Sequence, residues 1–368
     1  MRKICLGIDL GGMYSCVSYV DVDGTARMIP SSDGSGYKTP SVMYVDPNTN
    51  EHIVGHRAKE ASRIHYENSI NSIKHYFSTY DFYCSINGKE YPPDLVVSYI
   101  LQKLVNDVEA YFKDVEIEGA VLTCPVFYTQ RNLSNLLSAA KKVTTKYGKP
   151  LKVHTVVSEP NAIAIAYDQL MNEDYSKTVL VFDLGGSMLD LTALQISSIN
   201  GEKVLEILGM DGNHYMASDS WNHALKNYVM DEFMDRTGFD LYDANDDVEL
   251  TKWFDENIEK AKITLSDCES VTLELSYAGM VEKFEITREL LDELTDPYLN
   301  GMIYTAKEMI QERLIGFDVD EVLLVGGGSK VPNVEHRIRK ELNIPTKLFE
   351  PDFAVAKGAA ILANTYSK

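Results

Sequence analysis

The chain has 368 residues, 45% of them hydrophobic, so it is long enough for two or three domains with substantial cores. Its formal net charge of −20 argues against binding to nucleic-acid backbones or anionic membranes, both of which attract basic surfaces. Its five cysteines are scattered without a Cys-x-x-Cys pair, which argues against a disulfide scaffold or a zinc site and favours a reducing, cytoplasmic compartment.

The first 45 residues are predicted to form strands joined by turns, and no apolar run in the chain approaches the ~20 residues of a membrane span. A strand at 3–6 leads into Gly-Ile-Asp-Leu-Gly-Gly-Met at 7–13. A second strand at 15–20 runs to a hairpin turn signal, Asp23-Gly24. Because glycines carry no side chains, backbone N–H groups in such a connection can approach a phosphate, and the aspartate can hold a metal-bound water.

Helices and strands alternate from there to residue 170. Residues 56–80 are predicted to be partly helical, and Ser158-Glu159-Pro160 is a helix-start signal. The predicted helices lie at 94–112, 130–147 and 161–170, and the predicted strands at 120–124 and 153–157.

The strand–glycine turn–strand unit occurs again in the second half. A polar stretch at 172–177 links the halves, and a strand then leads into Phe-Asp-Leu-Gly-Gly-Ser-Met at 182–188. A strand at 189–196 and an Asn200-Gly201 turn complete the second copy. Two such units facing each other would grip a triphosphate from both sides, whereas two unrelated β-turns are the alternative interpretation.

The remainder of the second half continues the alternation and predicts an α/β fold. An apolar strand at 322–325 ends in Gly326-Gly327-Gly328, a strand–loop–helix pattern for phosphate or nucleoside binding without the Gly-Lys-Ser/Thr of a Walker loop. An acidic loop is expected at 240–247. Helices are predicted at 219–237, 248–265, 288–296, 299–315, 335–342 and 354–366, and strands at 271–275 and 281–286.

Together these segments resemble the nucleotide-binding (ATPase) domain of the 70-kDa heat-shock chaperone family, of which this chain would be a divergent member. The segments occur in the family's order and cover essentially the whole chain. They are 7–17, Thr39-Pro40-Ser41, Val54-Gly55, 158–167, 181–190, Glu-Lys-Ala-Lys-Ile-Thr-Leu-Ser at 259–266, 324–332 and 351–360.

The resemblance implies an actin-like ATPase fold. Two lobes, each with a ribonuclease-H-like core and an inserted subdomain, would enclose a deep cleft and move as hinged bodies. Lobe I would comprise 1–172 and 350–368 with an insertion at about 37–95, and lobe II would comprise 173–349 with an insertion at about 212–291.

The resemblance also implies roles for charged residues. Asp9 and Asp183 would hold waters around a magnesium ion, and Glu159 and Asp190 would complete its shell. Lys74 would be the catalytic lysine near the γ-phosphate during in-line attack by water. An aspartate at a strand end can instead cap a turn, and Lys74 could instead be a solvated lysine on a helix.

Contacts to the nucleotide are implied on both glycine loops and beyond them. The phosphates would meet Gly11, Gly12, Met13, Gly185, Gly186 and Ser187. The ribose and adenine would meet Glu256, Glu259, Lys262, Ser266, Gly326, Gly327, Lys330 and Asp352. Glu259 and Lys262 are also three residues apart on one helix, so an ordinary salt bridge is the competing interpretation.

Several positions depart from the family pattern. Two threonines of the first loop are replaced by Gly12 and Met13, and a glycine and a threonine of the second by Ser187 and Met188. A glycine pair is replaced by Ala217-Ser218, whose Cβ atoms would crowd a phosphate. The adenine-stacking arginines are replaced by Ile263 and Lys330. We therefore expect weaker nucleotide binding, slower hydrolysis, or both.

The function implied is the ATP-binding domain of a heat-shock-type molecular chaperone, which binds ATP or ADP with Mg²⁺ and hydrolyses ATP slowly as its lobes move. A degenerate nucleotide-binding module that acts through partners, with little or no hydrolysis, is the alternative, and a sugar or acetate kinase is a third. Expected partners are co-chaperones and a peptide-binding domain absent from this chain. A cytoplasmic monomer is expected, with no nucleic-acid or membrane partner.

Overall fold

The computed structural model describes residues 2–77, 84–170, 175–199, 202–213, 216–244 and 247–367. Parts of the expected polar link and acidic loop, and the Asn200-Gly201 turn, lie outside the described residues. The chain divides into two compact units, Met1–Glu173 with Phe353–Lys368, and Asp174–Asp352. The lobe boundaries predicted after residues 172 and 349 lie one and three residues from these divisions.

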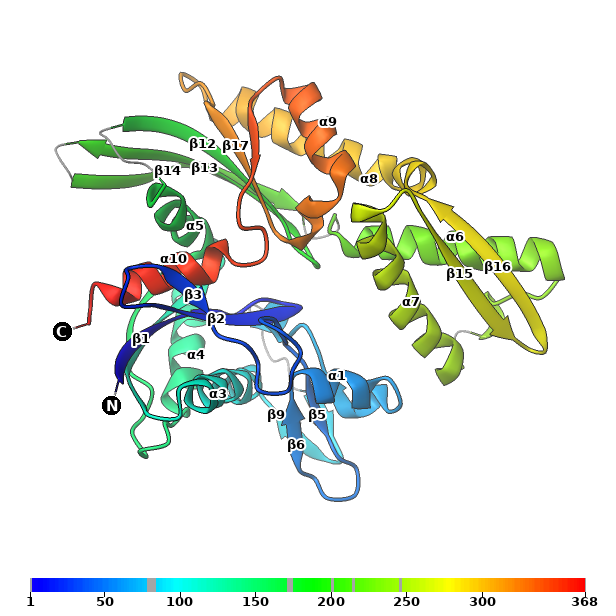
Figure 1. Cartoon of the computed structure of the whole chain (residues 1–368), viewed down its shortest axis with the longest axis horizontal. Coiled ribbons are helices and arrows are strands. Elements are labelled where there is room, and N and C mark those ends of the chain that lie inside the picture. Colours follow the sequence, from blue (N-terminus) through cyan, green and yellow to red (C-terminus); the bar gives the residue numbers. More distant parts are fainter. Residues whose placement is uncertain are drawn as a thin grey trace. The chain divides into compact units, whose positions relative to one another are not determined.

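The first unit is built on a sheet with the strand order β11-β10-β1-β2-β3, with β4 paired to β2 (Figure 1). β1 is parallel to β10 and antiparallel to β2, which follows it in the chain. The strands are β1 (Arg2–Asp9), β2 (Tyr14–Val20), β3 (Ala26–Met28), β4 (Thr39–Pro40), β10 (Val115–Cys124) and β11 (Val153–Ser158). Most residues of β1, β2 and β10 are buried, as expected for strands covered on both faces.

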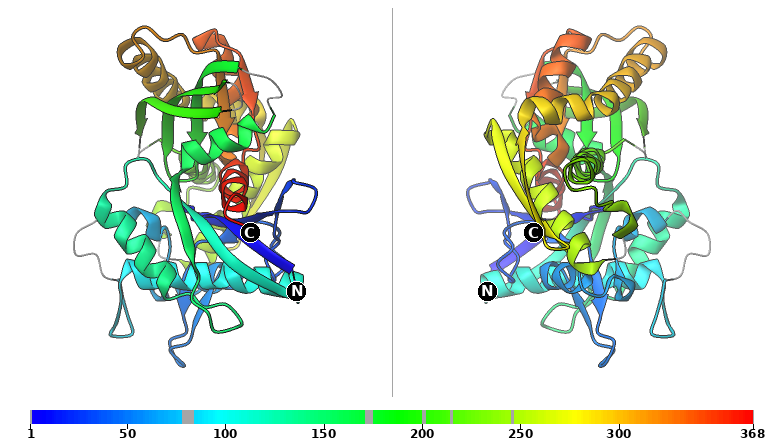
Figure 2. Two further views of the ribbon diagram at one scale, coloured as in Figure 1. Left: turned by 90° about the vertical axis from the view of Figure 1, so that its left-hand side faces the viewer. Right: turned by 90° about the vertical axis from the view of Figure 1, so that its right-hand side faces the viewer.

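Helices cover both faces of this sheet. α10 (Ala354–Asn364) packs on β1, β2, β10 and on α5 (Glu159–Asp168), as Figure 2 also shows for α10 beside β1. α3 (Pro93–Phe112) and α4 (Gln130–Lys141) pack against each other on the opposite face. The helix near the C-terminus, α10, therefore covers one face of the sheet to which β1, near the N-terminus, belongs.

A smaller substructure lies within residues 43–91 of the same unit. A three-stranded sheet pairs β5 (Met43–Val45) with β6 (His52–Val54) and β7 (Ser69–Ile70). The other elements are α1 (His56–Ser62), η1 (Tyr66–Asn68), α2 (Ile73–Tyr76) and the hairpin of β8 (Cys84–Ile86) with β9 (Lys89–Tyr91).

The second unit repeats the central arrangement of the first. Its sheet has the order β14-β13-β12-β17-β18, in which β12 is antiparallel to the next strand, β13, and parallel to β17. The strands are β12 (Tyr175–Leu184), β13 (Leu189–Ile199), β14 (Glu202–Asn213), β17 (Glu321–Val325) and β18 (Thr346–Leu348). A hairpin flanked by a parallel strand thus occurs in both units, which confirms the duplicated strand–glycine turn–strand unit.

Helices and a second hairpin complete this unit. Their apolar faces form one large core with β12, β13 and β17. The elements are α6 (Asp219–Thr237), η2 (Tyr242–Ala244), α7 (Val248–Asp267), β15 (Ser270–Tyr277), β16 (Met280–Thr287), α8 (Arg288–Glu308), η3 (Met309–Arg313), η4 (Gly327–Lys330) and α9 (Pro332–Leu342). Within the described ranges, no helix combines the length and apolar character required to cross a membrane.

Two helix predictions were wrong. The break predicted near residue 297 does not occur, because α8 runs through Pro297 with Leu291 and Leu299 buried on either side of it. Core packing thus outweighs the helix-breaking effect of the proline. The helix predicted to reach residue 147 ends at Lys141, because Gly148 (φ 72°) belongs to a separate turn in which its N–H donates to the carbonyl of Thr145.

The contact of α10 with α5 depends on Gly358. A Cβ atom at this position would lie 1.7 Å from the carbonyl oxygen of Ala162, so we expect Gly358→Ala to lower the free energy of unfolding by about 1–3 kcal/mol, measured by urea denaturation. Gly209→Ala is the control, because its Cβ atom would make an ordinary contact 3.6 Å from Leu314. Equal stability of the two variants would contradict the prediction.

Candidate functional site

The first glycine loop joins Asp9, at the end of β1, to Tyr14, at the start of β2. A Cβ atom on Gly11 would lie 2.0 Å from the carbonyl oxygen of Tyr14, so the turn requires glycine there. Ser41 supports the loop from outside. Its hydroxyl donates to the carbonyl of Gly11 at 2.8 Å, and its N–H donates to that of Met13 at 2.9 Å.

A buried ionic cluster lies beside this loop. The Nζ of Lys74, on α2, donates to the Oε1 of Glu159, the first residue of α5, at 2.5 Å, and each side chain is only 10% exposed. Thr123 donates to the Oδ1 of Asp9 at 3.2 Å. The cluster forms where β1, β10 and β11 end, the edge at which open α/β sheets bind ligands. The structure therefore brings together the three charged residues of the first unit that were predicted to act at a nucleotide site, Asp9, Lys74 and Glu159.

The charges of this cluster perturb one another. Burial, followed by repulsion from Glu159, raises the pKa of Asp9 to about 6. Burial by itself would lower the pKa of Lys74, but the carboxylates of Glu159 and Asp9 outweigh it, and this pKa is raised. Lys74 therefore remains a cation at neutral pH, and it is the one ammonium beside the carboxyl groups of Glu159 and Asp9.

Three further residues border the cluster, and sequence reasoning did not select them as functional. They are Thr123 and Cys124, at the end of β10, and Tyr128, whose hydroxyl donates to the carbonyl of Lys74 at 3.5 Å. Burial raises the pKa of the Cys124 thiol to about 11, so it is an inert thiol at neutral pH. The position of Thr123 at the end of a strand parallel to β1 is the signal that could have identified it.

The second glycine loop lies in the second unit. Asp183 and Asp190 are direct partners across β12 and β13, so both carboxylates flank the loop that joins these strands. A Cβ atom on Gly326, which has a φ of 79°, would lie 2.5 Å from the Oδ1 of Asp183. The third glycine run thus approaches the second loop closely, and only glycine fits there.

Ser218 connects the second glycine loop, the third glycine run and α7 within this unit. Its N–H donates to the carbonyl of Gly185 at 3.0 Å, and the N–H of Asp219 donates to that of Gly186 at 3.1 Å. Its carbonyl accepts a hydrogen bond of 3.1 Å from the buried Nζ of Lys262, whose pKa is lowered by burial. A Cβ atom on Gly328 would lie 2.7 Å from the Cβ of Ser218, so the serine already fills the space beside the third glycine run.

The residues predicted to meet the nucleoside fall into two groups within this unit. Lys330 forms an ion pair with Asp352, and a Cβ atom on Gly327 would lie 3.7 Å from the same carboxylate. The other group lies along α7 and comprises Glu256, Glu259, Lys262 and Ser266. On that helix Ile263 is 59% exposed, while Lys262 is turned inward.

The four carboxylates predicted to surround magnesium are divided between the units. Asp9 and Glu159 belong to the first unit, and Asp183 and Asp190 to the second. Over the described ranges, no group of three or more His, Cys, Asp or Glu side chains is arranged to hold a metal ion. The magnesium shell therefore stays a prediction.

An α/β fold with one strand–glycine turn–strand hairpin in each unit is typical of nucleotide-binding domains, and comparison with known proteins identifies the family of this chain. The chain matches the family model for Hsp70 protein over residues 5–83 and 78–368. Over 98% of its length it is 33% identical to proteins named chaperone protein DnaK from Thermotoga petrophila, Thermotoga maritima and Thermotoga neapolitana. The chain belongs to the Hsp70 family. The match spans 59% of the length of each of these relatives.

The buried ion pair predicts a specific pattern of stability. Lys74→Met leaves the carboxylates of Glu159 and Asp9 together without their cation, and we expect it to lower the free energy of unfolding by about 3–5 kcal/mol. Adding Glu159→Gln should recover most of this loss, because it removes the charge left uncompensated. Urea unfolding of the single and double variants measures both effects.

The control for this comparison is Lys142→Met, which breaks a more exposed pair with Asp94 and should cost less than about 1 kcal/mol. A double variant less stable than Lys74→Met would contradict the electrostatic account of the cluster.

Proposed function

We propose that this chain binds ATP and ADP with magnesium and hydrolyses ATP slowly, as the ATPase domain of an Hsp70-type chaperone. The observation that carries the proposal is the buried Lys74–Glu159 pair beside Asp9 and the first glycine loop. Burying charges is costly, and strongly perturbed groups cluster at functional sites. An ordinary stabilising contact would not require an ion pair whose two side chains are each only 10% exposed, with a second carboxyl group, that of Asp9, close enough to feel both charges.

The carboxylates fit a divalent cation. Asp9 and Glu159 place two carboxyl groups beside a single ammonium, that of Lys74. Burial, followed by repulsion from Glu159, raises the pKa of Asp9, and a divalent cation bound there would relieve that repulsion. We propose that they hold magnesium with Asp183 and Asp190, largely through waters. The bound ion would neutralise charge on the phosphates.

Lys74 would act as a fixed positive charge. Its raised pKa keeps the ammonium protonated, so it cannot accept a proton from the attacking water. It can stabilise charge developing on the γ-phosphate, and Glu159 keeps it in place. The backbone of Gly11 and Gly12, and of Gly185 and Gly186, would face the phosphates.

A second candidate is a nucleotide-binding module with little or no hydrolysis. It is favoured by Ser218, whose Cβ atom occupies the space beside Gly328, and by Met13, which is 38% exposed where the family has a threonine. In this case nucleotide would act by changing how the domain contacts co-chaperones or a peptide-binding domain. In both cases we propose a cytoplasmic, monomeric domain.

Turnover separates the two candidates. We expect calorimetry to detect ATP and ADP binding in the presence of magnesium, and phosphate release to be slow and lost in Lys74→Ala. Loss of one electrostatic group typically costs about 10²–10³ in rate. Binding without release would support the second candidate, and binding of neither nucleotide would refute both.

Restoring glycine at the start of α6 should tighten binding. Ala217→Gly with Ser218→Gly removes the Cβ atom beside Gly328, and we expect an ATP dissociation constant about tenfold lower, or about 1.4 kcal/mol. Ala278→Gly, in the β15–β16 turn at a φ of 51°, is the matched control and should leave the constant unchanged. An unchanged constant in the double variant would show that these Cβ atoms do not limit binding.

A further inference from the structure

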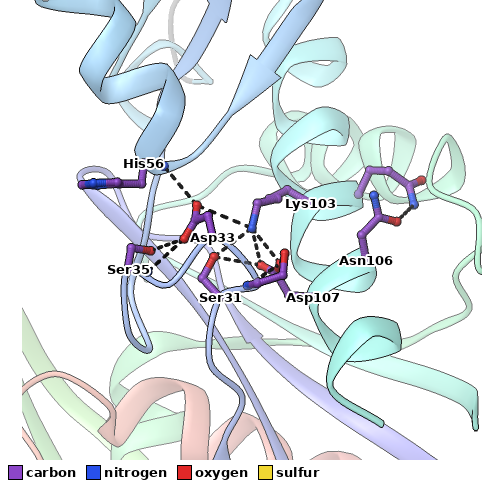
Figure 3. A network of polar contacts seen from close by, with 9 residues as sticks. Ser31, Asp33, Ser35, His56, Lys103, Asn106 and Asp107 are labelled. Atoms are coloured by element: carbon purple, nitrogen blue, oxygen red, sulfur yellow. Dashed lines mark hydrogen bonds and ion pairs between the residues drawn. The ribbon is translucent and has the colours of Figure 1, made fainter. Parts of the chain in front are cut away.

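A polar network in the first unit holds the segment Ser31–Gly36 against α3 (Figure 3). Its centre is Asp107, on α3, which is only 1% exposed. One carboxylate oxygen accepts the N–H of Ser32 at 3.0 Å and its hydroxyl at 2.6 Å, and the other accepts the hydroxyl of Ser31 at 3.3 Å. Lys103, one turn earlier on the helix, donates to both oxygens at 2.7 Å.

Lys103 extends the network to a second carboxylate. Its Nζ also donates to the hydroxyl of Ser31 at 2.8 Å and lies 3.8 Å from Asp33. Asp33 accepts the N–H of Ser35 at 3.1 Å and its hydroxyl at 2.6 Å. Burial would raise the pKa of Asp33, but these hydrogen bonds and the charge of Lys103 lower it to about 2, so it is ionised at neutral pH.

Asp33 also connects this segment to α1. The N–H of His56, the first residue of α1, donates to Asp33 at 3.4 Å. Ser31 closes the segment by donating its N–H to the carbonyl of Gly36 at 2.7 Å. One ammonium and two carboxylates therefore fix a turn that contains no regular secondary structure.

The turn leads directly to the support of the first glycine loop. Only Tyr37 and Lys38 separate it from β4, which pairs with the first residues of β2. Ser41 follows β4 directly in the chain. It is only 1% exposed and donates hydrogen bonds to the carbonyls of Gly11 and Met13. The glycine loop thus rests on Ser41, and the strand before Ser41 is anchored to α3 by the ionic network.

We propose that Lys103 and Asp107 are positioning residues for the first glycine loop, acting through the Ser31–Gly36 turn, β4 and Ser41. The proposal rests on the proposed function, because it assigns the loop to the phosphates. Lys103 and Asp107 would not touch the nucleotide themselves. Their effect is to restrict where the backbone around Gly11 can lie, and small displacements of positioning groups have large effects on binding and rate.

The test compares variants of the network on α3 and in the Ser31–Gly36 turn with a control on the same helix. Asp107→Asn and Lys103→Met remove the charges, and Ser32→Ala removes one donor to Asp107 with less risk to folding. Asp94→Asn is the matched control. It removes a carboxylate of α3 that lies outside the network and pairs with Lys142, the residue that follows α4. Amide hydrogen exchange and calorimetric titration with Mg-ATP are measured on each.

We expect exchange in segments 11–16 and 37–42 to accelerate about tenfold in Asp107→Asn and Lys103→Met, and less in Ser32→Ala. The ATP dissociation constant should rise about tenfold in the first two variants, while Asp94→Asn keeps wild-type values. A merely structural role for the network would lower the melting temperature of these variants without changing exchange in segment 11–16 relative to the rest of the sheet.

The proposal is overturned if segment 31–36 exchanges faster while segment 11–16 stays protected, or if Asp94→Asn has the same effect. Should Asp107→Asn fail to fold, Ser32→Ala and Lys103→Met decide the outcome. If the wild-type chain binds no ATP, the proposed function fails, but the exchange measurements still test the link between α3 and the loop.

Discussion

The candidate site of the first unit is organised around one buried ammonium group. Lys74 lies on a four-residue helix that could not be stable alone, and its charge is balanced by Glu159 at the start of a helix from a distant part of the chain. Placing these charges together requires the ends of β1, β10 and β11 to be brought to one edge. The close packing of α10 on that sheet at Gly7, and on α5 at Gly358, is part of the same requirement.

The two units use the same hairpin in different ways. In the first, Ser41 holds the carbonyls of the glycine loop, and the charges lie in the space beside it. In the second, the N–H groups of Ser218 and Asp219 hold the loop carbonyls, and the third glycine run lies directly against Asp183. Ser218, which stands where the family pattern has glycine, both holds the second loop and lies against the third glycine run, where a Cβ atom on Gly328 would be 2.7 Å from its own Cβ.

Much of the fold could be predicted because local patterns agreed with the final packing. The duplicated Asp-Leu-Gly-Gly unit and the helix at 219–237 are examples, since glycine turns and helical periodicity are properties of short segments. One error arose where distant contacts decide the outcome, because Pro297 stays helical where the core holds both sides of it. The other was local, since Gly148 belongs to a turn with Thr145 rather than to a helix end.

The candidate site shows the same division. Asp9, Lys74 and Glu159 could be selected because motifs mark them. Thr123 could have been indicated only by its place at the end of a strand beside β1, and Tyr128 is found only through its hydrogen bond to Lys74. Lys103 and Asp107 illustrate the point further. In the sequence of α3 they are an ion pair four residues apart, and such a pair on a helix surface adds little to helix stability. Their importance arises because Asp107 is buried and three polar groups of a separate turn converge on it, a relation that only the folded chain reveals.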